Sequence, residues 1–194
     1  FSLTVFSQFS KTHYIPPLSN GDSQDPQGQY LYISTPSVTA INFTINPIGG
    51  TPITGTVSRN TPYVYTIGSG YDTQLLISQT DVATIKNNKG YIIEAEDMIY
   101  VNVRMTATPQ SFHAGGIVSK GLAALGTQFR IGAFTNLGAP NNTENHYTFA
   151  TILATENNTT ISFSDIKPGV TLINGTGNTQ NNIVLNYGES FAIA

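Results

Sequence analysis

Short segments in which apolar and polar residues alternate, bounded by glycine, proline or asparagine, run through most of the chain and constrain its fold. In residues 98–106, for example, Ile99, Val101 and Val103 point to one side of a strand and their neighbours to the other. No long stretch repeats apolar residues at the i, i+3, i+4, i+7 spacing of an amphipathic helix. The pattern predicts an all-β protein of antiparallel strands.

Turn-forming residues separate the predicted strands, and three pairs of strands read as hairpins. These hairpins turn at Glu96 and Asp97, at residues 156–158, and at Gly188 and Glu189. The predicted strands lie at residues 30–34, 38–46, 52–57, 62–67, 91–95, 98–106, 112–119, 127–134, 146–154, 159–164, 170–173, 183–187 and 190–194.

An internal repeat divides the chain. Residues 32–44 resemble residues 152–164 at an offset of 120, and residues 57–63 resemble residues 185–191. The match predicts two tandem antiparallel β-sandwich-like units. The first covers residues 1–119, and the second covers residues 120–194 and is incomplete at its C-terminus.

The junction between the two units lies in residues 120–131, where Gly121 and Gly126 can adopt a positive φ and turn the chain sharply. Residues 129–131 correspond to residues 13–15 at the start of the first unit. We expect the native chain to continue beyond Ala194, where a segment like Asn88-Lys89-Gly90-Tyr91-Ile92-Ile93 should recur.

Composition narrows the classes of partner. Charged residues make up 10% of the chain, the net charge is −3 and the pI is about 5.5, so no nucleic acid or anionic membrane is expected as a partner. No apolar run approaches the ~18 residues of a transmembrane helix. Without cysteine, the chain offers no thiolate zinc site. Polar positions filled by Asn, Thr, Ser, Gln and Gly suit a secreted all-β protein.

Few residues are candidates for catalysis or for binding a metal or cofactor. His13, His113 and His146 are far apart in the sequence, and ordinary strand or loop histidines are the preferred interpretation. Ser119 and Lys120 are adjacent, which is not the spacing of a nucleophile and its base. We therefore predict no catalytic, cofactor-binding or metal-binding residue, and binding residues stay unassigned.

The acidic residues form one cluster, Glu94, Glu96 and Asp97. A pair of carboxylates can hydrolyse glycosides when the two groups flank the scissile bond. Because the cluster falls at a predicted hairpin turn, solvated side chains are the preferred interpretation.

Two segments near the N-terminus, residues 1–7 and loop 19–29, each allow two interpretations. Loop 19–29 contains Asn20, Asp22 and Asp25, whose oxygens could bind calcium, but their spacing matches no standard calcium loop and a solvated turn is preferred. Residues 1–7 are compatible with a strand or with the end of a secretory signal peptide cut near residue 7.

Two surface features complete the survey. Chance accounts for most N-glycosylation patterns in so Asn- and Thr-rich a chain. The tyrosines could form an aromatic binding surface, although half-buried positions in sheets are preferred. The N-glycosylation patterns begin at Asn42, Asn141, Asn157, Asn158 and Asn174.

Four segments together resemble one protein family. These segments are Asn88-Lys89-Gly90-Tyr91-Ile92-Ile93-Glu94-Ala95 through Val103, Lys120-Gly121-Leu122 with Ala124-Leu125-Gly126-Thr127-Gln128-Phe129, Ala154-Thr155-Glu156-Asn157-Asn158-Thr159-Thr160-Ile161, and residues 185–192. They are similar to the N-terminal domain of IgG-Fc-binding protein, a secreted mucus component, and of its bacterial relatives. With residues 11–18 included, the chain resembles the N-terminal region of very large surface proteins of gliding Bacteroidetes, exported by the type IX secretion system.

The resemblance implies a secreted, non-enzymatic module at the N-terminus of a large cell-surface adhesin, attaching to surfaces, glycans or partner proteins in gliding motility. Its expected partners are an extracellular surface, glycan or protein ligand, the rest of its own chain, and the secretion machinery during export. The alternatives are a structural part of a surface filament and a carbohydrate-active enzyme domain. The resemblance transfers no ligand-binding residue.

Overall fold

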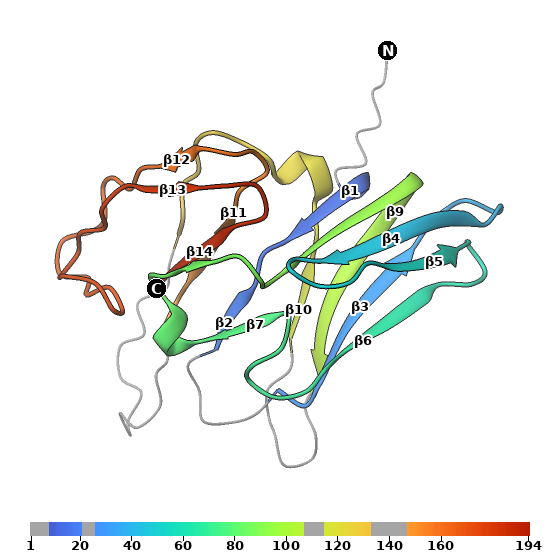
Figure 1. Ribbon diagram of the computed structural model, residues 1–194, viewed down its shortest axis with the longest axis horizontal. Helices are drawn as coiled ribbons and strands as arrows, with labels where there is room; N and C mark the ends of the chain where they lie inside the picture. Colours follow the sequence, from blue (N-terminus) through green and yellow to red (C-terminus); the bar gives the residue numbers. More distant parts are fainter. Residues whose placement is uncertain (1–7, 21–25, 107–114, 133–146) are drawn as a thin grey trace.

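The computed structural model describes residues 8–20, 26–106, 115–132 and 147–194, and nearly all regular structure in them is β (Figure 1). This confirms the all-β prediction. Two short 3-10 helices, η1 (Gln79–Asp81) and η2 (Gly121–Ala124), interrupt the strands. The strands are β1 (Phe9–Ile15), β2 (Leu18–Asn20), β3 (Gly28–Ser34), β4 (Ile41–Pro47), β5 (Ile53–Val57), β6 (Tyr63–Gly68), β7 (Leu76–Ser78), β8 (Ile85–Lys86), β9 (Tyr91–Thr106), β10 (Gly115–Val118), β11 (Ala150–Leu153), β12 (Thr159–Ile161), β13 (Ile183–Leu185) and β14 (Ser190–Ile193).

The largest sheet has seven strands and is organised around β9. One edge of β9 pairs first with β4 and then with β3, and the other edge pairs with β1 and then with β10. Two four-stranded halves result, β5-β4-β9-β1 and β6-β3-β9-β10, and they share β9. The sheet curls so that the halves face each other, and the rings of Phe43 and Tyr63 meet edge to face at 4.8 Å.

The hairpin predicted at Glu96 and Asp97 is wrong, because β9 continues through these residues as one strand of 16 residues. Pairing on both edges holds the chain extended before and after this point. Both acidic residues are exposed at the place where β9 leaves β4 and joins β3. Glu96 and Asp97 therefore lie where β9 crosses from one half of the sheet to the other, and the chain does not reverse there.

The main core lies between the two halves. Alternate residues of β3 and β4 point into it, as the sequence pattern predicts. Burial of such side chains contributes roughly 1.5–3 kcal/mol each to folding. The fifteen buried members are Ile15, Leu18, Leu31, Ile33, Ile41, Phe43, Ile45, Val57, Leu75, Leu76, Tyr91, Ile93, Ile99, Val101 and Val103.

The Asn88-Lys89-Gly90 string closes one end of this core. Gly90 has a φ of +90° and donates its N–H to the carbonyl oxygen of Gln74 at 2.7 Å, and its own carbonyl accepts from the Gln74 side chain at 2.9 Å. A Cβ at position 90 would lie 2.5 Å from the carbonyl oxygen of Ile15. Only glycine fits this position, so the string has a structural role.

The strands of the C-terminal part pair differently from the prediction. β11 pairs with β14, which also pairs with β8, and β12 pairs with β13. The two hairpins predicted around residues 156–158 and around Gly188 and Glu189 are therefore wrong. Both connections run from one strand pair to the other instead of reversing the chain within a pair. The two connections are hydrogen-bonded to each other: the Asn157 side chain accepts the N–H of Tyr187, and the Asn186 side chain accepts the N–H of Asn158.

Two other predicted strands are not found in the described residues. Residues 127–132 and residues 170–173 contain no strand. The β14–β8 pairing and a hydrogen bond of 2.9 Å from Ala83 N to Ala192 O join the C-terminal strands to the first part of the chain. The division into units at residues 119 and 120 stays a prediction.

Candidate functional site

A row of polar side chains crosses four neighbouring strands on the solvent side of the main sheet. Thr54 of β5 pairs with Thr44 of β4, Thr44 pairs with Glu94 of β9, and Glu94 pairs with Thr12 of β1. Directly paired residues point to the same face of a sheet. Thr54 and Glu94 are exposed and the other two are half-buried, so the row is open to solvent.

Neighbouring residues widen this row into a polar face. Asn42 pairs with Thr56, and both are exposed. Along β4, Phe43 and Ile45 alternate with Asn42 and Thr44 and point into the core instead. We define the polar face as Thr12, Asn42, Thr44, Asn46, Thr54, Thr56, Glu94 and Glu96.

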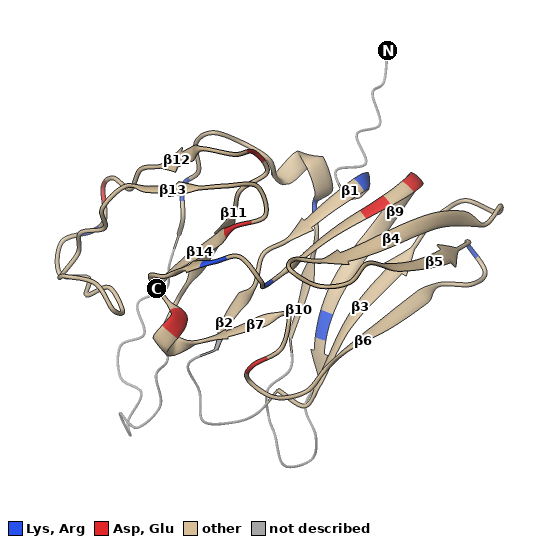
Figure 2. Cartoon of the chain, viewed as in Figure 1, with Lys and Arg blue, Asp and Glu red and all other residues tan. Residues whose placement is uncertain are grey.

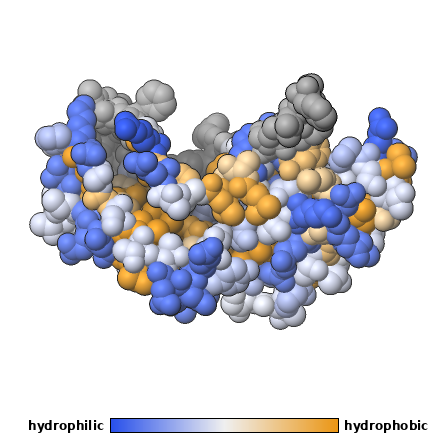
Figure 3. Space-filling model, turned by 90° about the horizontal axis from the view of Figure 1, so that it is seen from above, coloured by the Kyte–Doolittle hydropathy of each residue, from blue (hydrophilic) through white to orange (hydrophobic). Residues whose placement is uncertain are grey.

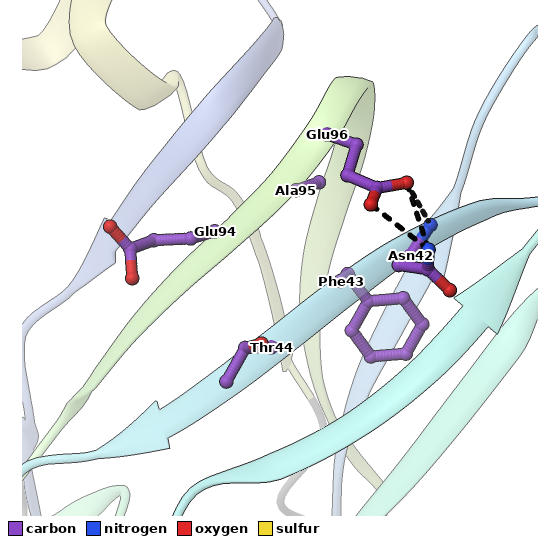
Figure 4. Close-up of a pocket in the computed structure, with 6 residues that line it drawn as sticks. All are labelled: Asn42, Phe43, Thr44, Glu94, Ala95 and Glu96. Carbon is purple, nitrogen blue, oxygen red and sulfur yellow. Dashed lines mark hydrogen bonds between the residues drawn. The ribbon is translucent and has the colours of Figure 1, made fainter.

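An open depression of about 270 Å³ lies on the polar face between β4 and β9 (Figure 4). The side chains of Phe43 and Ala95 pack on the main core, and the other four lining side chains are polar. Its lining residues are Asn42, Phe43, Thr44, Glu94, Ala95 and Glu96.

Hydrogen bonds orient both glutamates of the depression. Asn42 donates its backbone N–H to the Glu96 carboxylate at 3.2 Å and its side-chain Nδ2 at 2.9 and 3.0 Å. The side-chain bond is the main cause that lowers the pKa of Glu96 below its usual value, and the backbone bond adds to it. Asn46 Nδ2 donates to Glu94 at 3.1 Å. Each carboxylate therefore keeps free lone pairs toward solvent in a fixed orientation.

The three carboxylates of the acidic cluster do not converge. Figure 4 shows Glu94 and Glu96 extending from β9 in opposite directions. Asp97 accepts the N–H of its neighbour Met98 at 2.8 Å. A glycosidase pair flanks one bond, and these residues do not form that arrangement. Their geometry suits acceptance of hydrogen bonds from hydroxyl groups.

His13 and Ser119, which are far apart in the sequence, form a hydrogen bond in the structure. The distance from His13 Nδ1 to Ser119 Oγ is 2.9 Å, and from His13 Nε2 to the Ile99 carbonyl oxygen it is 3.0 Å. A carbonyl only accepts, so Nε2 carries the proton and Nδ1 accepts from the Ser119 hydroxyl. Ser119 Oγ in turn accepts the N–H of Gly121 at 3.4 Å.

This pair has the connectivity of a base and a nucleophile, but both side chains are buried. Burial is also the main cause that lowers the pKa of His13. The network fastens β1, β9 and η2 to one another. No local pattern reveals it, because the two residues are 106 positions apart.

Charged groups are scattered over the described residues without a patch of one sign (Figure 2). Several form local contacts: Lys86 pairs with Asp81 at 2.7 Å, and the Arg104 guanidinium lies 5.7 Å from the Tyr32 ring centroid. Most strand tyrosines, Tyr30 and Tyr32 among them, are half-buried, which confirms the preferred interpretation of the tyrosines.

The remaining sequence candidates are only partly described. Asn20 lies in β2, but Asp22, Asp25, His113, His146 and Asn141 fall outside the described residues, as do residues 1–7. In the described ranges no group of three His, Asp or Glu side chains could hold a metal ion, and no helix is long and apolar enough to cross a membrane.

Two of the four described asparagines that begin glycosylation patterns, Asn42 and Asn174, donate hydrogen bonds from the nitrogen that would carry a glycan. Asn42 Nδ2 is bonded to Glu96, and Asn174 Nδ2 donates to the carbonyl oxygens of Gln79 and Val82 at 2.9 and 3.1 Å. A glycan on either nitrogen would remove one of its protons and disturb these bonds.

Comparison of the chain with protein-family models, with curated proteins and with solved structures gave no match.

Proposed function

We propose that this protein is a non-enzymatic attachment module of a large secreted cell-surface adhesin, and that the polar face contacts a polysaccharide or another hydroxyl-rich surface. The observation that carries the proposal is the row Thr54, Thr44, Glu94 and Thr12, which crosses four paired strands. The resemblance to the N-terminal regions of gliding adhesins supports the location at the cell surface.

The chemistry of the polar face suits a polyhydroxylated ligand. Hydroxyl groups of threonine donate and accept, amides of asparagine do both, and carboxylates of glutamate accept. A sheet holds these groups in fixed positions, so little conformational entropy is lost on binding. The face is broad and its depression is open, which favours an extended polymer with several weak contacts over one enclosed small molecule.

The test is retention of the purified protein on polysaccharide beads, mucin and glass, with a Thr54→Ala/Glu94→Ala double variant. We expect retention of the unmodified protein and about tenfold weaker binding of the variant. The matched control is Thr66→Ala/Glu156→Ala, which changes the same residue types at exposed positions outside the polar face. Failure of all three materials to retain the protein, or equal loss in both variants, overturns the proposal.

A further inference from the structure

The connection between β13 and β14, residues 186–189, lies against one end of the polar face. At this end Tyr14 of β1 pairs with Ile92 of β9, and Ile92 pairs with Asn46 of β4. Paired residues share one side of a sheet, and alternate residues of a strand do too, so this is the side of Glu94. Ile92 is only 5% exposed and is not among the fifteen members of the main core. Another segment therefore covers it on the solvent side.

Two observations place the connection there. A Cβ on Gly188 would lie 3.7 Å from Cγ2 of Ile48, the residue that follows β4. Burial is the main cause that raises the pKa of Tyr14, and electrostatic contributions from Tyr187 and Glu94 add to it. Such contributions weaken with distance, so both groups lie near the Tyr14 hydroxyl. Figure 1 shows the connection between β13 and β14 beside β1, in agreement with both observations.

Hydrogen bonds fix the backbone of this connection. Asn186 donates its N–H to the Glu189 carboxylate at 2.7 Å, and Glu189 donates its own N–H to the Asn186 carbonyl oxygen at 2.9 Å. Tyr187 donates its N–H to the Asn157 side chain at 3.0 Å. The Tyr187 side chain is 52% exposed. The connection thus presents one aromatic ring to solvent from a backbone that is already ordered, which lowers the entropy lost on binding.

The surroundings of this ring combine apolar and polar groups. Asn46 orients the Glu94 carboxylate, and Thr12 is paired with Glu94. Figure 3 shows hydrophobic residues among hydrophilic ones near the middle of the molecule, where the main sheet and the C-terminal strands meet. A pyranose sugar has matching chemistry, because its C–H face packs on an aromatic ring and its hydroxyl groups bond to carboxylates and threonine hydroxyls.

The charges near the ring disfavour an acidic ligand. Glu94 and Glu96 lie on the polar face, and Glu189 lies in the connection. Lys11 of β1, whose Nζ donates to the Glu96 carbonyl oxygen at 2.8 Å, offsets only part of this negative charge. A uronic acid or a sulfated sugar would bring a further negative charge close to these carboxylates, whereas a neutral sugar meets no such repulsion.

We propose that Tyr187, Tyr14 and Glu94 form a subsite for one neutral pyranose unit of a polysaccharide. The ring of Tyr187 packs on the C–H face of the sugar, the Glu94 carboxylate accepts from its hydroxyl groups, and the Tyr14 hydroxyl adds a donor. The subsite rests on the proposed attachment function, because it lies at one end of the polar face. It goes beyond that function by selecting neutral sugars over acidic sugars and over mineral surfaces.

The test is affinity electrophoresis of the protein in native gels that contain a polysaccharide. The neutral polymers are hydroxyethyl cellulose, dextran and galactomannan, and carboxymethyl cellulose supplies a glucose polymer with added carboxylates. We expect at least one neutral polymer to retard the protein, and carboxymethyl cellulose to bind at least about fivefold more weakly than that polymer.

Three variants make the test specific to the ring. Tyr187→Ala should weaken binding to the neutral polymer roughly fivefold to tenfold, whereas Tyr187→Phe, which keeps the ring, should bind within about twofold of the unmodified protein. Phe129→Ala removes a 64% exposed ring outside the polar face and the connection, and should change nothing. Hydrogen exchange in residues 150–153 and 190–193 shows whether each variant keeps β11 and β14 paired.

The outcomes separate the subsite from the attachment function. Equal binding of Tyr187→Ala and the unmodified protein, equal losses in Tyr187→Phe and Tyr187→Ala, tighter binding to carboxymethyl cellulose, or no retardation by any neutral polymer overturns the subsite. The polar face still stands if Thr54→Ala/Glu94→Ala alone weakens retention on beads or glass. The attachment function fails if polysaccharide beads, mucin and glass all leave the unmodified protein unbound.

Discussion

At the residue scale, His13 shows how one side chain connects segments that are distant in sequence. Its two ring nitrogens bond to Ser119 and to the Ile99 carbonyl, and Gly121 follows directly in the same network. Gly121 has a φ of +54°, and a Cβ there would clash with Ser10 of β1. The glycine therefore lets η2 approach β1 closely enough for the network to form.

The pKa of His13 predicts a pH dependence. Burial lowers its pKa in the folded protein below the ordinary value of 6.5, so the unfolded chain takes up the proton first as the pH falls. Stability from this residue is complete above pH 6.5, is lost progressively below it, and stays constant below the folded-state pKa. Urea unfolding at several pH values between about 8 and 5 measures the effect.

His13→Gln is the matched variant for this measurement. Glutamine keeps an N–H donor for the Ile99 carbonyl and does not titrate. The variant should be less stable at neutral pH, and its stability should fall less between pH 6.5 and 5 than that of the unmodified protein. If the free energy of unfolding had the same pH dependence in the variant and in the unmodified protein, the pKa of His13 would be the same in the folded and unfolded states, which would contradict the prediction.

At the scale of the element, β9 is the strand on which the main sheet depends. It pairs with four other strands and contributes Tyr91, Ile93, Ile99, Val101 and Val103 to the core. The sequence reveals its alternation, but not that the segments before and after Glu96 and Asp97 form one strand. Turn residues predict a reversal only when no partner strands hold the chain extended.

Truncation of one β9 side chain measures this dependence. Ile93 is fully buried between partners on β1 and β4, so Ile93→Ala should lower the free energy of unfolding by about 2–5 kcal/mol. Ile117→Ala on β10 is the control, because this side chain is 47% exposed and its truncation should cost less than about 1 kcal/mol. Urea denaturation measures both values, and similar losses would contradict a core centred on β9.

At the scale of the whole molecule, the main sheet and the C-terminal strands β11 to β14, called here the second group, differ in how much apolar surface they bury. The main sheet has a large core. The second group has a small core, which is joined to the main part of the chain by the pairing of β8 with β14 and by the hydrogen bond from Ala83 to Ala192. Regions with few buried apolar contacts open at lower free energy than the rest of a protein. The second group should therefore be the less stable part.

Hydrogen exchange followed by mass spectrometry tests this order. Amides of β9 should exchange slowest, near the limit set by global unfolding, and amides of β11 and β12 should exchange several-fold faster. Ile93→Ala should accelerate exchange in β9 most. Equal protection of all strands would mean that the described residues unfold as one cooperative unit.

Part of the candidate site could be predicted. The sequence identifies Glu94 and Glu96 as a cluster and the alternation of Asn42 and Thr44 along a strand. It does not show that Thr54, Thr44, Glu94 and Thr12 form one row, because their alignment depends on the register of three strand pairs. Register is set by core packing between distant segments, which no local pattern contains.

By itself, the sequence determined that this chain is all-β, where most strands lie and which side chains alternate into the core. These properties follow from a period of two residues, which is local. Only the tertiary structure decided that β9 passes between two halves, that β11 pairs with β14 and β12 with β13, and that His13 meets Ser119. Such choices depend on contacts across tens of residues, where burial of apolar surface on both faces selects one pairing among several that the strand pattern permits.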